Sequence, residues 1–237
     1  MEPHCAHRRG FSLIELLVVL TIITVVTLVV FTSQGSFNKT VILSNTAYDV
    51  ALTIRFTETY GLGSRAHNAA VNTGYGLHFE RSVTDHFTMF ADTFPSVGSR
   101  HEHTDDVCHW KPDYDETGPS ALAGDCVYTP DADPTLDERV QDYMLGNGVT
   151  IKDFCAEAAG VWACANSDNG GPRISSLDIV FARPNPTPFM SKNGAYLRVP
   201  SVTGACITLT SLQGEFKYIT VGASGQISAN AAPCAAS

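Results

Sequence analysis

Two polar clusters hold side chains of the kinds that coordinate metal ions. The first begins His101-Glu102-His103, and imidazole and carboxylate groups suit divalent transition metals. The second places Asp131 and Asp133 at alternate positions, as at the start of a calcium loop, but lacks the glycine and glutamate that complete an EF-hand. Each cluster also fits a solvated polar loop. The sequence therefore predicts no metal and no cofactor. His101, His103, Asp131 and Asp133 are weak metal candidates, and a structural calcium ion is the alternative.

Motifs for catalysis are missing from the chain. The sequence has no G-x-S-x-G, no H-E-x-x-H and no phosphate-binding glycine loop, so we expect no enzyme activity. The formal net charge of -9 produces a field that repels polyphosphates, which argues against nucleic acid as a partner. With 44 % hydrophobic and 16 % charged residues, the chain has the composition of a folded protein with an apolar segment.

Six of the seven cysteines lie in the C-terminal part of the chain, after residue 100. They are Cys108, Cys126, Cys155, Cys164, Cys206 and Cys234, whereas Cys5 stands in the first ten residues. An even number of cysteines in an exported domain indicates disulfides. None of the six has the C-x-x-C spacing that would indicate a zinc site. Six cysteines allow 15 pairings, among which sequence does not choose. We favour neighbours in order: Cys108–Cys126, Cys155–Cys164 and Cys206–Cys234.

Glu15 is the only charge in the apolar run from Phe11 to Phe31. These 21 residues are enough to cross a bilayer, and in lipid an isolated segment must be helical. Arg8 and Arg9 precede the run, so the positive-inside rule places the N-terminus in the cytoplasm and exports the rest. A carboxylate in such a segment costs a few kcal/mol and normally has a partner and a role.

Other export signals explain this region less well. A secretory signal has a shorter apolar run and a small-residue cleavage site, and the sequence after Phe31 is a poor site. A twin-arginine signal fits Arg8-Arg9 but needs the same kind of site. Neither of them, nor a plain membrane anchor, explains Glu15.

The run Gly10-Phe11-Ser12-Leu13-Ile14-Glu15-Leu16, preceded by Arg8-Arg9, resembles the N-terminal signature of type IV pilins and type II secretion pseudopilins. The resemblance implies that prepilin peptidase cuts after Gly10 and methylates the new amine of Phe11. It also implies that Glu15 neutralises the amine of a neighbouring subunit in a filament. Residues 1–10 are then a leader, 11–33 a transmembrane helix, and the partners are the peptidase, other pilin subunits and the membrane. Loss of the leader removes Cys5.

Beyond the membrane, residues 34–60 predict an amphipathic continuation of the same helix. Leu43, Ala47, Val50 and Ile54 recur at helical spacing, with Ala51 beside them, and this stripe should pack on the exported domain. The stretch Gly61-Leu62-Gly63-Ser64 should end the helix.

Residues 61–237 predict a β-rich extracytoplasmic domain, which makes the fold α+β: a long helix packed on an antiparallel sheet. The candidate strands are Tyr75–Phe79, His86–Phe90, Leu177–Phe181, Ala195–Val199, Ala205–Leu209 and Phe216–Val221, with turns at Leu212–Gly214 and Gly222–Gly225. Residues 82–172 suggest a large irregular insertion held by two disulfides, with a helix near Leu136 to Leu145.

A second resemblance concerns the order of these elements. The order is a helix ending near Tyr60, then Gly74-Tyr75-Gly76-Leu77-His78-Phe79, Asp178-Ile179-Val180-Phe181 and Ile219-Thr220-Val221, with Gly225 in the last turn. It is similar to that of the subfamily of H-class minor pseudopilins and FimT-like minor pilins. Its DNA-uptake members carry basic residues near that turn, but here Gln226 follows. The sequence thus predicts a minor pilin or pseudopilin in the inner membrane. The alternative is a singly anchored extracytoplasmic module that binds a metal or ligand.

Overall fold

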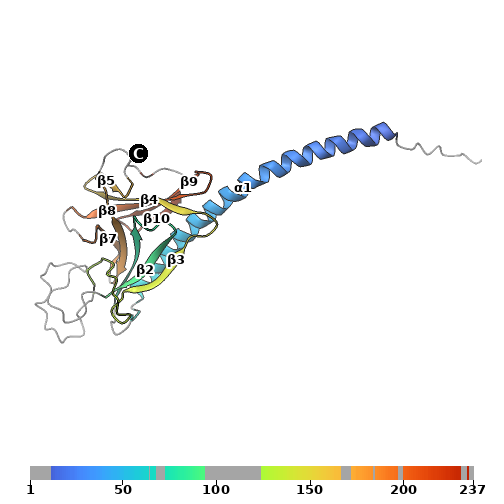
Figure 1. Cartoon of the computed structure of the whole chain (residues 1–237). Helices are drawn as coiled ribbons and strands as arrows, with labels where there is room; N and C mark the ends of the chain where they lie inside the picture. Colours follow the sequence, from blue (N-terminus) through green and yellow to red (C-terminus); the bar gives the residue numbers. More distant parts are fainter. Residues whose placement is uncertain are drawn as a thin grey trace, which may run out of the picture. The chain divides into compact units, whose positions relative to one another are not determined.

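The computed structural model describes residues 12–63, 65–67, 73–93, 124–166, 172–183, 185–196, 200–230 and 234. They form one long helix, α1 (Leu13–Leu62), and ten strands (Figure 1). The strands are β1 Gly74–Glu80, β2 His86–Asp92, β3 Arg139–Met144, β4 Thr150–Ala158, β5 Val161–Cys164, β6 Ser176–Ala182, β7 Asn185–Lys192, β8 Val202–Thr210, β9 Phe216–Gly222 and β10 Ile227–Asn230. The α+β class predicted from the sequence is confirmed.

Two five-stranded antiparallel sheets make up the β structure of the described residues, whereas the sequence predicts one sheet. Their strand orders are β3-β2-β1-β6-β7 and β10-β9-β8-β4-β5. Side chains alternate between the faces of each strand, so one face of each sheet supplies a common hydrophobic core. In β1 the core-facing residues are Tyr75, Leu77 and Phe79, and His78 lies on the opposite face.

The C-terminal half of α1 packs on this core through the predicted stripe. Leu43, Ala47, Val50, Ala51 and Ile54 are all buried and belong to the same cluster as the core-facing strand residues. The residues of the stripe lie three or four positions apart, which keeps them on one side of a helix. This part of the prediction is confirmed.

The helix ends at the predicted glycines. The amide of Gly63 donates to the carbonyl of Tyr60 at 3.1 Å, and Leu62 is the last helical residue. A β-carbon at Gly61 would overlap the backbone carbonyl of Phe181 in β6. Only glycine therefore lets the last turn of α1 lie this close to the sheet.

The helix predicted near Leu136 to Leu145 is wrong. Residues 139–144 form β3, which pairs antiparallel with β2. The segment contains helix formers such as Gln141 and Met144, but pairing with an otherwise open sheet edge outweighs their small intrinsic preferences. The 82–172 region is also less irregular than expected, because β2, β3, β4 and β5 all lie in it.

The strand expected at Ala195–Val199 is not found in the described residues. Ala195 makes only an isolated bridge to Lys192, and residues 197–199 lie outside the described part. The preceding segment instead forms β7, which the sequence did not suggest because Pro186 and Pro188 interrupt it. Proline is tolerated there because β7 is an edge strand. The other predicted strands and both turns are present.

Candidate functional site

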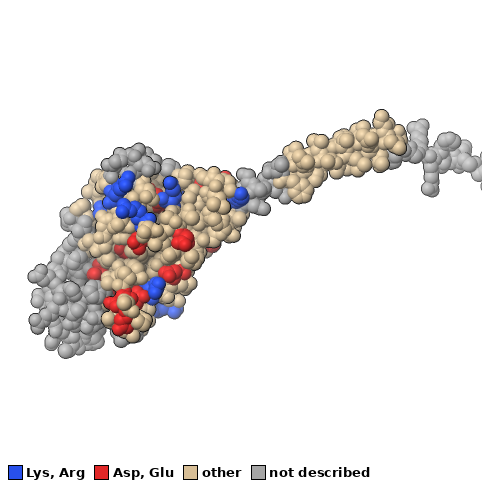
Figure 2. Space-filling model, viewed as in Figure 1, with Lys and Arg blue, Asp and Glu red and all other residues tan. Residues whose placement is uncertain are grey.

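The first part of α1 has the properties of a membrane span. Residues Leu13–Phe31 have a mean hydropathy of 2.9 and are long and apolar enough to cross a bilayer. Their large apolar side chains are exposed all round the helix, so the protein's own core does not cover them. On the face drawn in Figure 2, this segment shows no charged side chain. A signal sequence would have the same length and composition. The polar side chains of the segment must therefore distinguish a membrane anchor from a signal sequence.

The polar side chains of this segment differ in whether the helix satisfies them. The hydroxyls of Thr21, Thr24 and Thr27 each donate to a carbonyl one turn earlier, at 2.7 to 3.1 Å. Glu15 lies in the first turn, where its amide donates to the carbonyl of Ser12 at 3.0 Å. The positive end of the helix dipole favours an anion there. Within the described residues, the Glu15 carboxylate has no cation beside it, which leaves it available to one from outside.

The residues predicted to be processed, Gly10 and Phe11, lie outside the described residues. Cleavage after Gly10 and methylation of Phe11 stay predictions, as do the boundaries at residues 10 and 33. The sequence spacing nevertheless places Phe11 four residues before Glu15, one turn of a helix.

Disulfides join two of the three pairs that we favoured. Cys155 and Cys164 are opposite each other on β4 and β5, with their Cα atoms 4.0 Å apart. The Cys206–Cys234 disulfide attaches the C-terminal segment to β8. Trp162 and Tyr218 pack against these four cysteines. Cys126 is also disulfide-bonded, and its expected partner, Cys108, lies outside the described residues.

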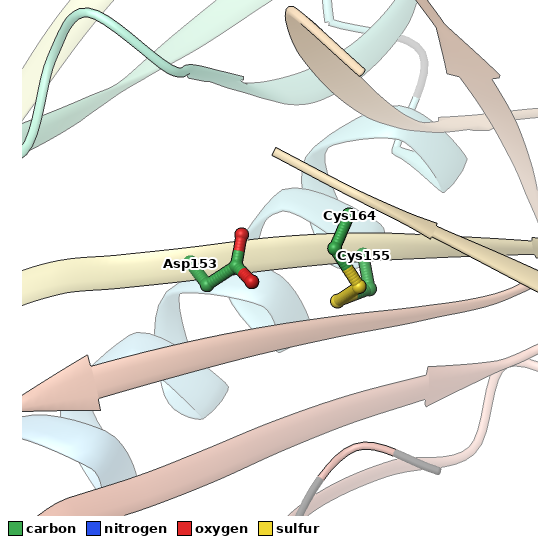
Figure 3. A group of neighbouring side chains, drawn as sticks. All are labelled: Asp153, Cys155 and Cys164. Carbon is green, nitrogen blue, oxygen red and sulfur yellow. A yellow bond between two sulfur atoms is a disulfide. The ribbon is translucent and has the colours of Figure 1, made fainter. Parts of the chain in front are cut away.

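One group of side chains has the spacing of a metal site but not the chemistry. Asp153, Cys155 and Cys164 have ligand atoms within 4.8 Å of one another (Figure 3). Both sulfur atoms are in the disulfide, so neither is a thiolate. One oxygen of Asp153 already accepts the amides of Phe154 and Asn166 at 2.8 and 2.9 Å. The oxidised protein therefore has no metal site here.

The metal candidates suggested by the sequence gain no support as a cluster. Asp131 and Asp133 accept backbone amides two residues further on, at 2.8 and 2.9 Å, as in ordinary polar turns. Hydrogen bonding to Thr135 lowers the pKa of the Asp133 carboxyl. His101 and His103 lie outside the described residues.

Two buried carboxylates, which the sequence did not single out, hold the segment before β3 against the first sheet. Glu138 accepts the amides of Thr93 and Thr129, both at 2.7 Å, and Asp92 accepts those of Asp125 and Cys126 at 2.9 and 3.0 Å. Neither side chain is appreciably exposed. Burial, and then the nearby Glu138 carboxylate, raise the pKa of Asp92 well above its usual value.

A row of polar side chains crosses the outer face of the first sheet. The strand register places Asp142, Thr88, His78, Asp178 and Ser191 side by side on β3, β2, β1, β6 and β7. His78 Nδ1 lies 2.6 Å from an oxygen of Asp178, and the Thr88 hydroxyl donates to Asp142 at 2.7 Å. Burial raises the pKa of Asp178, although the hydrogen bond from His78 opposes this.

His78, Thr88 and Asp142 of this row line a solvent-open pocket of about 250 Å³. The pocket is lined by His78, Glu80, Val83, His86, Phe87, Thr88, Tyr128, Pro130, Arg139 and Asp142. Tyr128 lies against His78, with ring centres 4.8 Å apart, and burial raises the pKa of its hydroxyl to about 12. The sequence pattern places His78 on the outer face of a strand. It does not reveal the buried partner of His78, because Asp178 lies 100 residues away in the chain.

Comparison with known proteins identifies a family motif at the N-terminus. A family model described as the prokaryotic N-terminal methylation motif matches residues 5–31. The match includes Gly10, Phe11 and Glu15, and it supports the type IV pilin and pseudopilin class, whose members are structural proteins. It does not single out the H-class or FimT-like subfamily within that class. No curated protein and no solved structure matches the chain.

Proposed function

We propose that this protein is a structural minor pilin or pseudopilin subunit of a type IV pilus or type II secretion filament. The observation that carries the proposal is Glu15: a carboxylate in the first turn of an apolar helix, inside the matched methylation motif, with no cation beside it among the residues that the structure describes. Prepilin peptidase would cut after Gly10, and the freed Phe11 amine of one subunit would meet Glu15 of the next. The domain would lie outside the inner membrane, in the periplasm or beyond.

A minor role, and membership of the H-class and FimT-like group, form the finer part of this proposal. Its support is the order of elements: the long helix, then β1 with its glycines, and the final turn at Gly225. Disulfides at Cys155–Cys164 and Cys206–Cys234, together with the long region between β2 and β4, suit a specialised subunit better than a tightly repeating one.

The test replaces Glu15 with alanine in the full chain, expressed with its own filament machinery. Removing a charge from an apolar span lowers the cost of insertion by up to a few kcal/mol, so insertion should not suffer. We expect normal leader cleavage, seen as a new N-terminus at Phe11 by mass spectrometry, and loss of the subunit from sheared filaments. Glu58→Ala, in the domain half of α1, is the matched control and should assemble normally.

Two results would contradict the proposal. One is normal assembly of the Glu15→Ala variant; the other is a mature protein that keeps Met1 or is cut near residue 33. The second result would favour the alternative, an anchored extracytoplasmic binding module, for which the pocket beside His78 gives structural support. Loss of secretion, or loss of piliation, in a deletion strain would identify the machine.

A further inference from the structure

The pocket beside β1 and β2 contains two histidines with the same arrangement. His78 Nδ1 lies 2.6 Å from Asp178, and His86 Nδ1 lies 2.8 Å from Asp85. A carboxylate beside Nδ1 places the proton there and leaves the Nε2 lone pair for another partner. Histidines that bind metals are held in this way, with the second nitrogen hydrogen-bonded to a carboxylate or carbonyl.

We propose that His78 and His86 bind a divalent transition-metal ion such as Zn²⁺ through their Nε2 atoms. Both residues line the pocket of about 250 Å³ on the outer face of the sheet. β1 and β2 are adjacent and antiparallel, and His78 is opposite Thr88. His86 is two residues from Thr88, so it shares the face of His78 and is its diagonal neighbour, within reach of long side chains.

Carboxylates at the same pocket can complete the coordination. Glu80 lines the same pocket, where its exposed carboxylate accepts the Ser82 hydroxyl at 2.8 Å, a surface hydrogen bond that a metal ion can replace. Asp142 also lines the pocket, where it accepts the Thr88 hydroxyl at 2.7 Å and pairs with Arg139 at 3.7 Å. Two imidazoles and one or two carboxylates form a ligand set that suits zinc, whereas calcium would require mostly oxygen ligands.

A purely structural role accounts for only part of this arrangement. Asp178 is completely buried and needs the hydrogen bond from His78, so that pair alone would serve folding. His86 is partly exposed, and its partner Asp85 is mostly exposed, so their bond satisfies no buried group. The pair His86–Asp85 beside the pair His78–Asp178, in one pocket, therefore points to a shared ligand rather than to two packing solutions.

The test uses the full chain in detergent micelles, stripped of metal with a chelator and titrated with ZnCl₂ by calorimetry. Metal analysis after dialysis gives the stoichiometry. We expect His78→Gln and His86→Gln each to remove one bound Zn²⁺. Asp178→Asn should weaken binding roughly 10- to 100-fold, as losses of such supporting groups do. His67→Gln is the matched control, because His67 lies outside this pocket and contacts the carbonyl of Asp137.

Other histidines provide an internal comparison. A His101→Gln/His103→Gln double variant should still bind the pocket ion, and excess Ca²⁺ should not displace it. The proposal is overturned if His78→Gln and His86→Gln bind Zn²⁺ as the unsubstituted protein does, or if binding is lost only in the double variant. Because His86 is partly exposed, its replacement should fold normally even if Asp178→Asn does not.

Discussion

Replacing Glu138 with alanine should destabilise the domain far more than its sequence context suggests. The side chain is fully buried, and its two oxygens accept the amides of Thr93, directly after β2, and Thr129, in the segment before β3. Alanine would leave both amides without an acceptor. The same change would remove the charge that lies near Asp92, so part of the loss is offset.

The contacts give the size of the effect. A buried donor left unsatisfied costs about 1–3 kcal/mol, so two amides together cost about 2–6 kcal/mol. Relief of repulsion with Asp92 lowers this figure, and we expect the free energy of unfolding to fall by about 2–5 kcal/mol. A domain is stable by about 5–15 kcal/mol in total, so the variant would be severely weakened.

Urea unfolding of the full chain in detergent micelles measures this loss, with near-ultraviolet circular dichroism following the domain. Glu58→Ala is the control, because its carboxylate makes a surface ion pair with Arg55 at 3.1 Å, and such pairs contribute at most about 1 kcal/mol. Glu138→Gln should fall between the two, since it keeps one acceptor but turns an amide group towards the other donor. A loss for Glu138→Ala no larger than that for Glu58→Ala would refute the account.

Two further outcomes concern pH and the disulfides. Burial raises the pKa of Asp92 in the folded state, so the folded protein keeps a proton that the unfolded chain releases above pH 3.8. The contribution of this group to the free energy of unfolding is therefore present at low pH and is lost as pH rises. Asp92→Asn should flatten that decline in unfolding free energy, and an unchanged slope would contradict it. The disulfides close sequence separations of 9 and 28 residues, so replacing both cysteines by alanine should cost about 2.6 kcal/mol for Cys155–Cys164 and about 3.6 kcal/mol for Cys206–Cys234. If urea unfolding showed the larger loss of stability for removal of Cys155–Cys164, loop length would not determine how much each disulfide stabilises the domain.

The sequence was informative where a local rule acts alone. A span in lipid must satisfy its own backbone, which makes Leu13–Phe31 helical whatever its valine content. The buried stripe from Leu43 to Ile54 follows from helical periodicity, and Gly61 from the need to end the helix. These features depend on neighbours within one or two turns, so single-sequence patterns predict them.

Long-range partners were not predictable in the same way. β3 is a strand because β2 offers it an edge, and nothing within residues 139–144 states this. His78 and Asp178 are 100 residues apart, and Glu138 reaches back 45 residues to Thr93. Polar side chains of this kind look like surface residues until the register of the sheet places them opposite one another.

The segment before β3 connects these observations. Cys126 lies in a small cluster with Phe90 and Val180 on the outer face of the first sheet, and its carbonyl accepts the Ser191 hydroxyl at 2.6 Å. Asp92 accepts the amides of Asp125 and Cys126 in the same segment, and Glu138 accepts that of Thr129. Tyr128, between these attachments, forms one wall of the pocket. Buried hydrogen bonds therefore fix a wall that would otherwise be a surface loop. The polar groups that stabilise the domain are thus the ones that shape its pocket, whereas Glu15 and the apolar span supply the features proposed for assembly.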